Sequence, residues 1–239
     1  MNTVLLEPAE IAAADGGRVR LANDRRVEHV RNVHRAKVGD SLRVGALGGR
    51  LGSATVVSLD DGGLELDVVV FDRDPPLPLP LVLILALPRP KVMRRVLQTV
   101  AALGVKRLVL IATWRVEKSY WESPWLAATQ LREQLLLGLE QACDTVLPVV
   151  TLHRRFKPFV EDELADLAGD SRRLLAHPAA ATPCPRVVGA PVTLVIGPEG
   201  ALTQYEVDAL TTHGCEPVSL GPRILRVEQA VPALIGRLF

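Results

Sequence analysis

The sequence predicts an α/β protein of two domains: a small β-rich domain in residues 1–73 and a larger domain with a parallel sheet in residues 81–239. Three observations lead to this fold class. Short β-prone runs separated by glycine turns fill the first 73 residues. From Leu81 onward, continuous apolar runs alternate with helical patterns, as in parallel sheets covered on both faces. Between them, residues 72–80 contain four prolines, so residues 74–80 are expected to form a semi-rigid linker.

In the first domain we expect one short helix and three strands. Val30, Val33 and His34 lie at i, i+3 and i+4, which predicts a helix over 27–35. A Leu-Gly-Gly turn predicts a hairpin. Its glycines lack the strand-then-helix setting of a phosphate loop, so we interpret them as turn residues. The expected strands are 41–44, 52–57 and 64–71.

The second domain is expected to begin with a strand–helix–strand unit. On its helix, Lys91, Arg94 and Arg95 form a basic stripe, and an apolar stripe lies on another face. The basic stripe fits either a contact with RNA phosphate or a solvated surface. The expected elements are strand 81–87, helix 91–103 and strand 106–111.

The middle of this domain continues the alternation. Ser123 at the N-cap and Pro124 at the first helical position predict a long helix over 125–142. A strand over 174–178 is expected to end in a turn at His177 and Pro178. Between these lie an expected strand, 146–152, and an acidic helix, 158–168, whose charges are expected to face water.

Two strand–turn–helix units close the chain. A capping box of Thr203 and Glu206 opens the first helix, which is expected to end near Gly214. The second helix is expected over 227–239, which is apolar with helical spacing. The two strands are expected over 192–196 and 216–220.

A glycine–proline turn follows each of these two strands, beginning at Gly197 and Gly221. Glycine allows close approach and proline fixes φ, so such turns hold main-chain N–H and C=O groups outward, suited to the edge of an adenine. We expect the turns at adjacent strand ends, on the edge where open α/β sheets bind ligands. The alternative is that they only connect elements while nearby charges face water.

Composition excludes several classes of protein. The net charge is only +1, but nine Arg or Lys residues and three Asp or Glu residues lie between Arg18 and Arg50. Such a segment is typical of a nucleic-acid partner or of a solvated face.

The three cysteines form no Cys-x-x-Cys pair and the histidines lack metal-ligand spacing, so neither a disulfide framework nor a metal site is expected. Without a signal peptide or a membrane-length apolar run, a cytoplasmic location is expected.

Two motifs carry a resemblance to a known family. Ile-Gly-Pro-Glu-Gly from Ile196 and Leu-Gly-Pro-Arg-Ile-Leu-Arg-x-Glu from Leu220 resemble the cofactor-binding end of the SPOUT superfamily of RNA methyltransferases, and most closely the RsmE family. The helix-then-barrel order of residues 1–73 resembles the PUA-like RNA-binding domain of RsmE proteins. The resemblance implies a carboxyl-terminal trefoil knot that holds S-adenosylmethionine. It also implies a homodimer, with the apolar helix 231–239 as a candidate interface or as a helix buried in its own chain.

The resemblance also implies site residues. Arg226 is expected to stabilise negative charge on the uracil oxygens, and Glu228 to accept a proton or to orient Arg226. The methyl group of S-adenosylmethionine is bonded to a positively charged sulfur atom, which already activates it for transfer, so no metal is required. The expected cofactor-binding residues are Leu175, His177, Ile196, Gly197, Pro198, Glu199, Gly200, Leu220, Gly221, Ile224, Leu225 and Arg226. The expected RNA-binding residues are Arg25, Arg31, Arg35, Lys37, Lys91, Arg94 and Arg223.

The activity implied is methylation of N3 of a uridine in 16S ribosomal RNA, with ribosomal RNA or the small ribosomal subunit as partner. Three positions depart from the family. Its Glu-Gln motif corresponds to Glu140 and Gln141, but Asp144 stands where an arginine is usual, and Val227 and Gln229 replace two threonines. Two alternatives therefore stay open: a SPOUT methyltransferase with another RNA target, or a non-catalytic RNA-binding or ribosome-assembly protein with a degenerate pocket.

Overall fold

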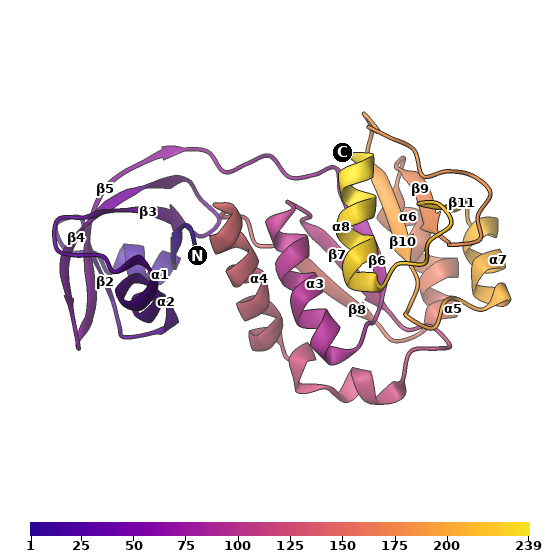
Figure 1. The fold of residues 1–239 in the computed structure, drawn as a ribbon, viewed down its shortest axis with the longest axis horizontal. Coiled ribbons are helices and arrows are strands. Elements are labelled where there is room, and N and C mark those ends of the chain that lie inside the picture. Colours follow the sequence, from indigo (N-terminus) through magenta and orange to yellow (C-terminus); the bar gives the residue numbers. More distant parts are fainter. The chain divides into compact units, whose positions relative to one another are not determined.

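The computed structural model describes residues 1–239, except for the side chain of Val69. The chain forms two compact units (Figure 1). The first comprises Met1–Leu77 and Leu136–Leu147, and the second comprises Pro78–Leu135 and Pro148–Phe239. The long helix α4 (Ala128–Ala142) therefore contributes residues to both units.

The first unit is built on a five-stranded sheet in the order β1-β3-β4-β5-β2. β1 pairs with β3 in parallel, and the other neighbouring strands pair antiparallel. β3, β4 and β5 contain the three predicted strands, whereas β1 and β2 were not predicted. The strands are β1 (Val4–Leu6), β2 (Arg18–Leu21), β3 (Ser41–Ala46), β4 (Leu51–Asp60) and β5 (Gly63–Arg73).

Short helices cover the core of this sheet. α1 spans Pro8–Ala12, and the predicted helix over 27–35 consists of α2 (Arg25–His29) and a π-helical turn (Val30–His34). The Asp24 side chain caps α2 by accepting from the N–H groups of Arg26 and Val27. Val27 and Val30 are fully buried against the apolar side chains of the sheet. Val33 is 64% exposed and His34 is also exposed, so of the predicted i, i+3, i+4 face only Val30 faces the core and the rest of that prediction is wrong.

The segment Leu136–Leu147 packs with the first unit although the sequence placed it in the second domain. The N–H groups of Asn2 and Thr3 donate to the carbonyl of Glu140 at 2.8 and 3.1 Å. The N–H of Gly48, in the β3–β4 turn, donates to the carbonyl of Thr145 at 2.8 Å. Main-chain hydrogen bonds thus attach the end of α4 and the chain after it to both the amino terminus and the hairpin. Helical spacing alone gave no indication of this partner.

The second unit contains a six-stranded sheet in the order β11-β9-β10-β6-β7-β8, and every neighbouring pair is parallel. The predicted α/β class is confirmed. The expectation of adjacent strands for the two glycine–proline turns is wrong, because β9 lies between β10 and β11. The strands are β6 (Leu81–Ala86), β7 (Arg107–Ile111), β8 (Val149–His153), β9 (Arg172–Ala176), β10 (Val192–Ile196) and β11 (Glu216–Val218).

Helices cover both faces of this sheet (Figure 1). α3 (Pro90–Ala102) and α8 (Val227–Leu238) lie side by side on one face, and α6 (Leu164–Ala168) and α7 (Gln204–Thr212) lie on the other. The apolar residues of α8, the candidate dimer interface, are buried within the chain: Val231, Leu234, Ile235 and Leu238. Among the described residues, the structure contains no helix with the length and apolar character needed to cross a membrane.

Two predicted helices are broken in the structure. Ser123 Oγ accepts from the N–H of Trp125 at 3.4 Å, but the helix it begins is only the 3-10 turn Pro124–Leu126. Ala127 is extended, and α4 starts after it. The Arg94 guanidinium lies 4.3 Å from the centre of the Trp125 ring and holds this turn against α3. The predicted acidic helix consists of α5 (Phe156–Pro158), a π-helical turn (Phe159–Glu163) and α6.

Candidate active site

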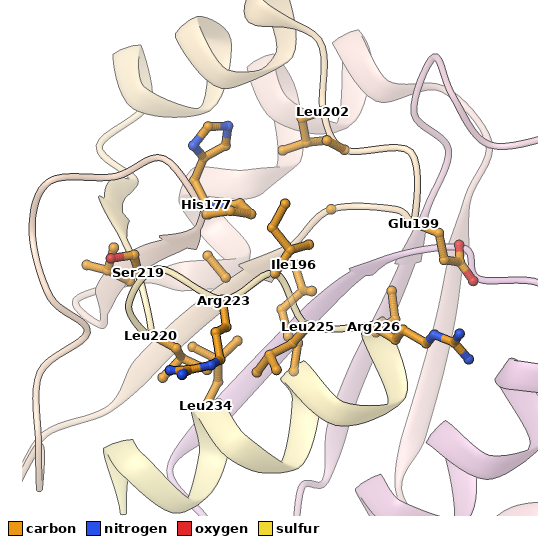
Figure 2. A pocket seen from close by; sticks show the side chains of 18 of the residues that line it. His177, Ile196, Glu199, Leu202, Ser219, Leu220, Arg223, Leu225, Arg226 and Leu234 are labelled. Atoms are coloured by element: carbon orange, nitrogen blue, oxygen red, sulfur yellow. The ribbon is translucent and has the colours of Figure 1, made fainter.

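The carboxyl ends of β9, β10 and β11 enclose a cavity of about 240 Å³. Its walls are the turns that follow these strands and the first turns of α8 (Figure 2). The lining is mostly apolar, and its ionisable side chains are those of His177, Glu199, Arg223 and Arg226. The other lining residues are Ala176, Pro178, Ile196, Gly197, Pro198, Ala201, Leu202, Val218, Ser219, Leu220, Gly221, Ile224, Leu225, Val227, Ala230 and Leu234.

The turn after β10 is fixed by close packing and by the helix that follows it. A Cβ atom at Gly197 would lie 2.9 Å from Cγ of Leu202, so a side chain there would displace a lining residue. The predicted capping box of α7 is confirmed: Thr203 Oγ1 accepts from the Glu206 N–H at 3.3 Å, and the Glu206 carboxylate accepts from the Thr203 N–H at 2.8 Å. Packing and helix capping thus both contribute to the position of this wall of the cavity.

The turn after β11 offers main-chain groups to the cavity. Gly221 has φ +110°, a conformation that glycine adopts without strain. Within the described part of the chain, the N–H groups of Leu220, Gly221 and residues 223–225 donate to no other protein group. The turn ends where the Arg226 N–H donates to Gln229 Oε1 at 3.3 Å, at the start of α8. Free N–H groups beside an apolar cavity match a flat ligand with polar edges.

The end of β9 supplies the third wall. The N–H of His177 donates to the carbonyl of Val218 at 2.9 Å, which ties the end of β9 to β11. Further along the same loop, Ser219 accepts from the Cys184 N–H at 2.8 Å and donates to the Thr182 carbonyl at 2.9 Å. Because β9 is bonded to both β10 and β11, it brings the two glycine–proline turns to one cavity although their strands are not neighbours.

Comparison with known proteins identifies the family. The model of the RNA methyltransferase domain matches residues 75–238. The chain belongs to this family. The ribosomal RNA small subunit methyltransferase E of Treponema pallidum is 29% identical over 98% of this chain and 88% of its own length. The same-named protein of Mycobacterium bovis is 25% identical, over 93% and 86%. The resemblance to the RsmE family is confirmed.

A solved structure shares the fold of this RNA methyltransferase. The ribosomal RNA small subunit methyltransferase E from Neisseria gonorrhoeae, crystallised with S-adenosyl methionine, superimposes with a TM-score of 0.75. It is 22% identical and the match covers 98% of this chain and 95% of that one. The likeness therefore extends through both units and supports the arrangement of strands within each of them.

Most residues predicted to bind the cofactor line the cavity of this methyltransferase domain. Two do not. Leu175 is fully buried in β9, and Gly200 packs against Arg115, whose Cβ and Cδ lie 3.3 Å from the position of a Cβ on that glycine. The predicted residues that line the cavity are His177, Ile196, Gly197, Pro198, Glu199, Leu220, Gly221, Ile224, Leu225 and Arg226.

The two residues predicted to be catalytic are placed differently. Arg226 lines the cavity and is exposed, and Figure 2 shows its side chain on the same side of the cavity as Glu199. Glu228 is half-buried in the first turn of α8 and is not part of the lining. Glu199 Oε1 accepts from the Arg89 N–H at 3.3 Å. The carboxylate that accompanies Arg226 at the cavity is thus Glu199.

The predicted RNA-binding residues of the second unit lie at two places. Arg223 lines the cavity and is exposed, whereas Lys91 and Arg94 are exposed on α3. In the first unit, Arg35 and Lys37 are exposed, and Arg31 donates to the carbonyl of Asp60 at 2.7 Å.

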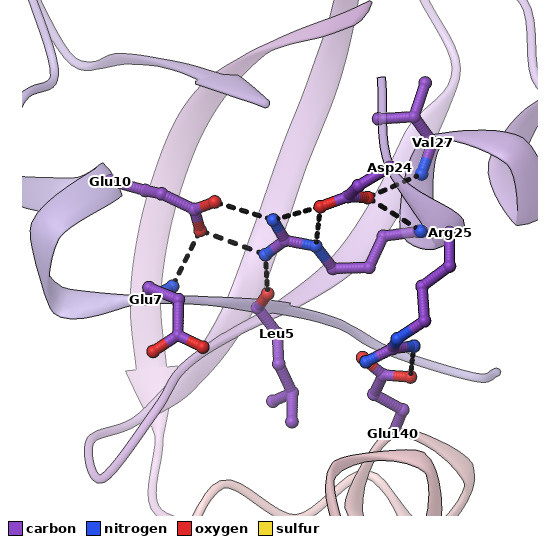
Figure 3. A network of polar contacts seen from close by, with 8 residues as sticks. Leu5, Glu7, Glu10, Asp24, Arg25, Val27 and Glu140 are labelled. Atoms are coloured by element: carbon purple, nitrogen blue, oxygen red, sulfur yellow. Dashed lines mark hydrogen bonds and ion pairs between the residues drawn. The ribbon is translucent and has the colours of Figure 1, made fainter. Parts of the chain in front are cut away.

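Arg25, the remaining predicted RNA-binding residue, forms a bidentate ion pair with Glu140 (Figure 3). Its two terminal nitrogens lie 2.6 and 2.8 Å from the carboxylate oxygens. The Glu140 side chain is only 1% exposed and that of Arg25 is 34% exposed. Asp144 is buried, and its Oδ1 accepts from the Val146 N–H at 2.9 Å. Both family-motif positions therefore take part in contacts inside the first unit.

Arg26 is the centre of a second network of polar contacts. It donates to carboxylate oxygens of Glu10 and Asp24 at 2.6 Å each and to the carbonyl of Leu5 at 2.7 Å. Burial raises the pKa of Asp24, but the hydrogen bonds and the charge of Arg26 outweigh it, so the pKa lies below its ordinary value. This basic residue holds α1, α2 and β1 together.

Sequence reasoning missed several lining residues. Leu202 follows the first motif by only two positions, and its role becomes evident only through its packing on Gly197. Val227, Ala230 and Leu234 lie on one face of α8, a helical spacing that would have identified them once the second motif was placed beside the helix. Among the described residues, no group of three or more His, Cys, Asp or Glu side chains is placed to hold a metal ion.

Proposed function

We propose that this RNA methyltransferase uses S-adenosylmethionine to methylate N3 of a uridine in small-subunit ribosomal RNA, in the cytoplasm. The observation that carries the proposal is the cavity at the ends of β9, β10 and β11, because both motif turns line it. The names of the relatives from Treponema pallidum and Mycobacterium bovis support ribosomal RNA as the target.

The residues of the cavity fit the cofactor. The apolar side chains of Ile196, Leu202 and Leu225 suit the faces of an adenine, and the free N–H groups of the turn after β11 suit its polar edge. Glu199 supplies a negative charge at the same cavity, which suits the positive charges of the cofactor. When bound, the cofactor supplies a methyl group on a positively charged sulfur atom.

The protein has two chemical tasks at N3. This nitrogen carries a proton at neutral pH, so the proton must leave and the resulting negative charge on O2 and O4 must be stabilised. Arg226 is proposed to provide the stabilising charge, since its guanidinium lines the cavity. Glu199 is proposed to accept the proton, and Glu228 to orient Arg226 from the first turn of α8. The cavity walls keep the base and the methyl donor in line.

RNA binding is proposed to involve both units, with residues 1–73 as a PUA-like RNA-binding domain, 74–80 as a linker and 81–239 as the SPOUT domain. The exposed side chains of Arg35 and Lys37 in the first unit and Lys91, Arg94 and Arg223 in the second suit phosphate contacts. Arg25 is proposed to serve first as the ion-pair partner of Glu140, to which it is bound in the structure.

The carboxyl-terminal chain is proposed to be knotted. The loop between β9 and β10 is bonded to the end of α8: Arg237 Nε donates to the Cys184 carbonyl at 2.6 Å, and the N–H groups of Val187 and Val188 donate to the carbonyls of Arg237 and Leu238 at 3.2 and 2.7 Å. These contacts between the loop and the last helix support a threaded chain. We also propose a homodimer; Ile224, an apolar lining residue that is 82% exposed, is a candidate contact.

A second candidate function keeps the cofactor and changes the RNA. Asp144 is buried and accepts from the Val146 N–H. Its side chain therefore makes a contact within the fold, whereas the arginine usual at this position could contact RNA. Val227 is buried and Gln229 caps α8. These departures favour a changed target over a lost cavity.

The experiment uses RNA from a strain that lacks the gene. Purified protein and S-adenosylmethionine are added to its small subunits and to its total RNA, and the products are mapped by mass spectrometry. We expect one new N3-methyluridine in the small-subunit RNA, which Arg226→Ala does not form. A methyl group in another RNA would support the second candidate. No methylation together with no cofactor binding by calorimetry would leave only a non-catalytic RNA-binding role.

A further inference from the structure

Trp114 is an unusually exposed tryptophan. It lies in the loop after β7 and its residue surface is 84% exposed. The other two tryptophans of the chain are covered: Trp121 is 8% exposed, and Trp125 lies under the guanidinium of Arg94. An indole left in water at a fixed place is a common feature of binding surfaces, since it offers a large apolar face with little loss of entropy on binding.

The loop that carries Trp114 is firmly anchored. The Trp114 N–H donates to Glu206 Oε1 at 2.6 Å, and Glu206 is only 3% exposed. The other oxygen of that carboxylate accepts from the N–H and Oγ1 of Thr203 at 2.8 and 2.9 Å. Thr113 and Val116 on either side are buried. The ring therefore projects from a main chain that is hydrogen-bonded to α7.

The same loop abuts the wall of the cavity. Arg115 Nη1 donates to the carbonyl of Gly200, and the Arg115 side chain fills the space above that glycine. Gly200 stands between Glu199 and Ala201, both of which line the cavity. Trp114 thus belongs to the strand-end edge of the sheet on which the methyl donor is proposed to bind.

The loop that carries Trp114 contains cationic side chains. Arg115 and Lys118 share its loop, and Arg89 is tied to Glu199 beside Gly200. The same loop also contains Glu117, whose Oε1 accepts from the Tyr120 hydroxyl at 2.9 Å. An exposed aromatic ring on a loop with cationic side chains suits RNA, whose bases stack on aromatic rings while its phosphates attract positive charge.

We propose that Trp114 is a substrate-binding residue that stacks on a base of the RNA beside the methylation cavity. This inference rests on the proposed function for the choice of substrate. It adds a contact that neither motif contains and that charge counting does not reveal. Stacking would hold an unpaired segment of RNA next to the cavity, which places the reacting base without adding any chemical step.

The first test is tryptophan fluorescence of the double variant Trp121→Phe/Trp125→Phe, in which Trp114 is the single emitter. Titration with a single-stranded, uridine-rich oligoribonucleotide is expected to quench the emission to saturation. Trp114→Leu is expected to weaken binding of the same oligoribonucleotide, measured by fluorescence anisotropy of a labelled RNA, roughly 10- to 100-fold. Trp114→Phe is expected to stay within about threefold of the wild type, because a ring remains.

Two further measurements separate the outcomes. Cofactor binding by calorimetry should be the same for Trp114→Leu and the wild type, and the leucine variant should raise KM for RNA more than it lowers kcat. Quenching without any methylation by the wild type would overturn the proposed function and keep the stacking role. Methylation with unchanged RNA affinity in Trp114→Leu would overturn the stacking role alone. A sedimentation coefficient that falls in Trp114→Leu would assign this surface to a second copy of the chain and also overturn it.

Discussion

Arginines in two regions of the molecule show opposite environments. In the first unit, Arg25 and Arg26 lie in the most basic part of the sequence, yet both are bound to buried or half-buried carboxylates. In the second unit, Arg223 and Arg226 line a cavity, and no ion pair is found for either within the described part of the chain. A basic segment in a sequence therefore does not by itself locate a binding surface. A better indication of a binding surface is an arginine whose guanidinium has no ion-pair partner within the protein.

The main chain shows the same contrast. In the first unit, the N–H groups of Asn2, Thr3 and Gly48 attach the end of α4 and the chain after it. In the second unit, the N–H groups of the turn after β11 are left for a ligand. Buried polar groups are normally satisfied, so a run of free groups at a cavity is more informative than the same residues in a fully bonded turn.

The largest expected effect is on stability in the first region. Arg25→Ala leaves the buried Glu140 carboxylate without its partner and is expected to lower the free energy of unfolding by about 3–5 kcal/mol. Glu140→Gln removes the buried charge and lets Arg25 turn to water, so its loss should be smaller, about 1–3 kcal/mol. Urea denaturation measures both. Arg50→Ala, which removes an exposed pair with Asp74, is the matched control and should leave stability unchanged. Equal losses at Arg25 and Glu140 would contradict the burial of the carboxylate.

The next effect is on activity in the second region. Arg226→Ala is expected to lower kcat for methyl transfer by about 10²–10³-fold, because the charge that develops on the uracil oxygens loses its donor. Its melting temperature should not change, since Arg226 is exposed. Arg186→Ala, an exposed arginine outside the cavity, serves as the control. Transfer of radiolabelled methyl groups gives the rates; a loss below about threefold would remove Arg226 from the reaction.

The variants Glu199→Gln and Glu228→Gln distinguish the roles proposed for these two carboxylates. If Glu199 accepts the proton, Glu199→Gln should lower kcat by about 10²-fold or more and flatten its rise with pH. Glu228→Gln should cost less, about tenfold, as expected of a group that acts through Arg226. The pH profiles of kcat for the two variants make the comparison. A flattened profile in Glu228→Gln alone would reverse the assignment.

Cys215 is a buried ionisable residue whose pKa, unlike the ion pair of Glu140, is governed mainly by burial. Burial raises the pKa of the Cys215 thiol to about 11, with Arg173 opposing only weakly. The folded protein then keeps this proton while the unfolded chain releases it near its ordinary pKa. The contribution to stability is present below about pH 9 and is lost as the pH rises toward 11, at most about 2–3 kcal/mol. Stability curves of wild type and Cys215→Ala between pH 8 and 11 should converge; parallel curves would refute the raised pKa.

The smallest effect concerns the turn after β11. Gly221 has φ +110°, so Gly221→Ala should strain the turn by about 1–2 kcal/mol and weaken cofactor binding about tenfold. Gly236→Ala in α8, where an added Cβ meets nothing within 4 Å, should leave binding unchanged. Calorimetry compares the two. Equal affinities would show that the turn does not hold the ligand.

Local patterns predicted much of the second unit. The run 192–196, the capping box of Thr203 and Glu206 and the strand 81–87 each depend on near neighbours, and the structure contains them within one or two residues. The strand order depends on contacts far apart in sequence. No local pattern indicated that β9 separates β10 from β11, or that Leu136–Leu147 packs with the first unit.

The candidate site was predictable to the same extent. The two glycine–proline motifs contain nine of the ten predicted cofactor residues that line the cavity, all but His177, because the residues of one turn are close together in sequence. Leu175 does not line the cavity, because it is fully buried in β9 one residue before Ala176, where the lining begins. The pairing of Arg25 with Glu140 joins residues 115 positions apart, which no spacing rule contains.

Titration of the protein with S-adenosylmethionine in a calorimeter tests the central claim most directly, when the wild type is compared with Gly197→Val. The Cβ atom of the added side chain would lie 2.9 Å from Cγ of Leu202, so this lining residue must move. Saturable binding of one cofactor per chain by the wild type, weakened at least tenfold in a folded Gly197→Val, is the result expected. Absence of binding by the wild type, or equal binding by both proteins, would contradict a cofactor held between these turns.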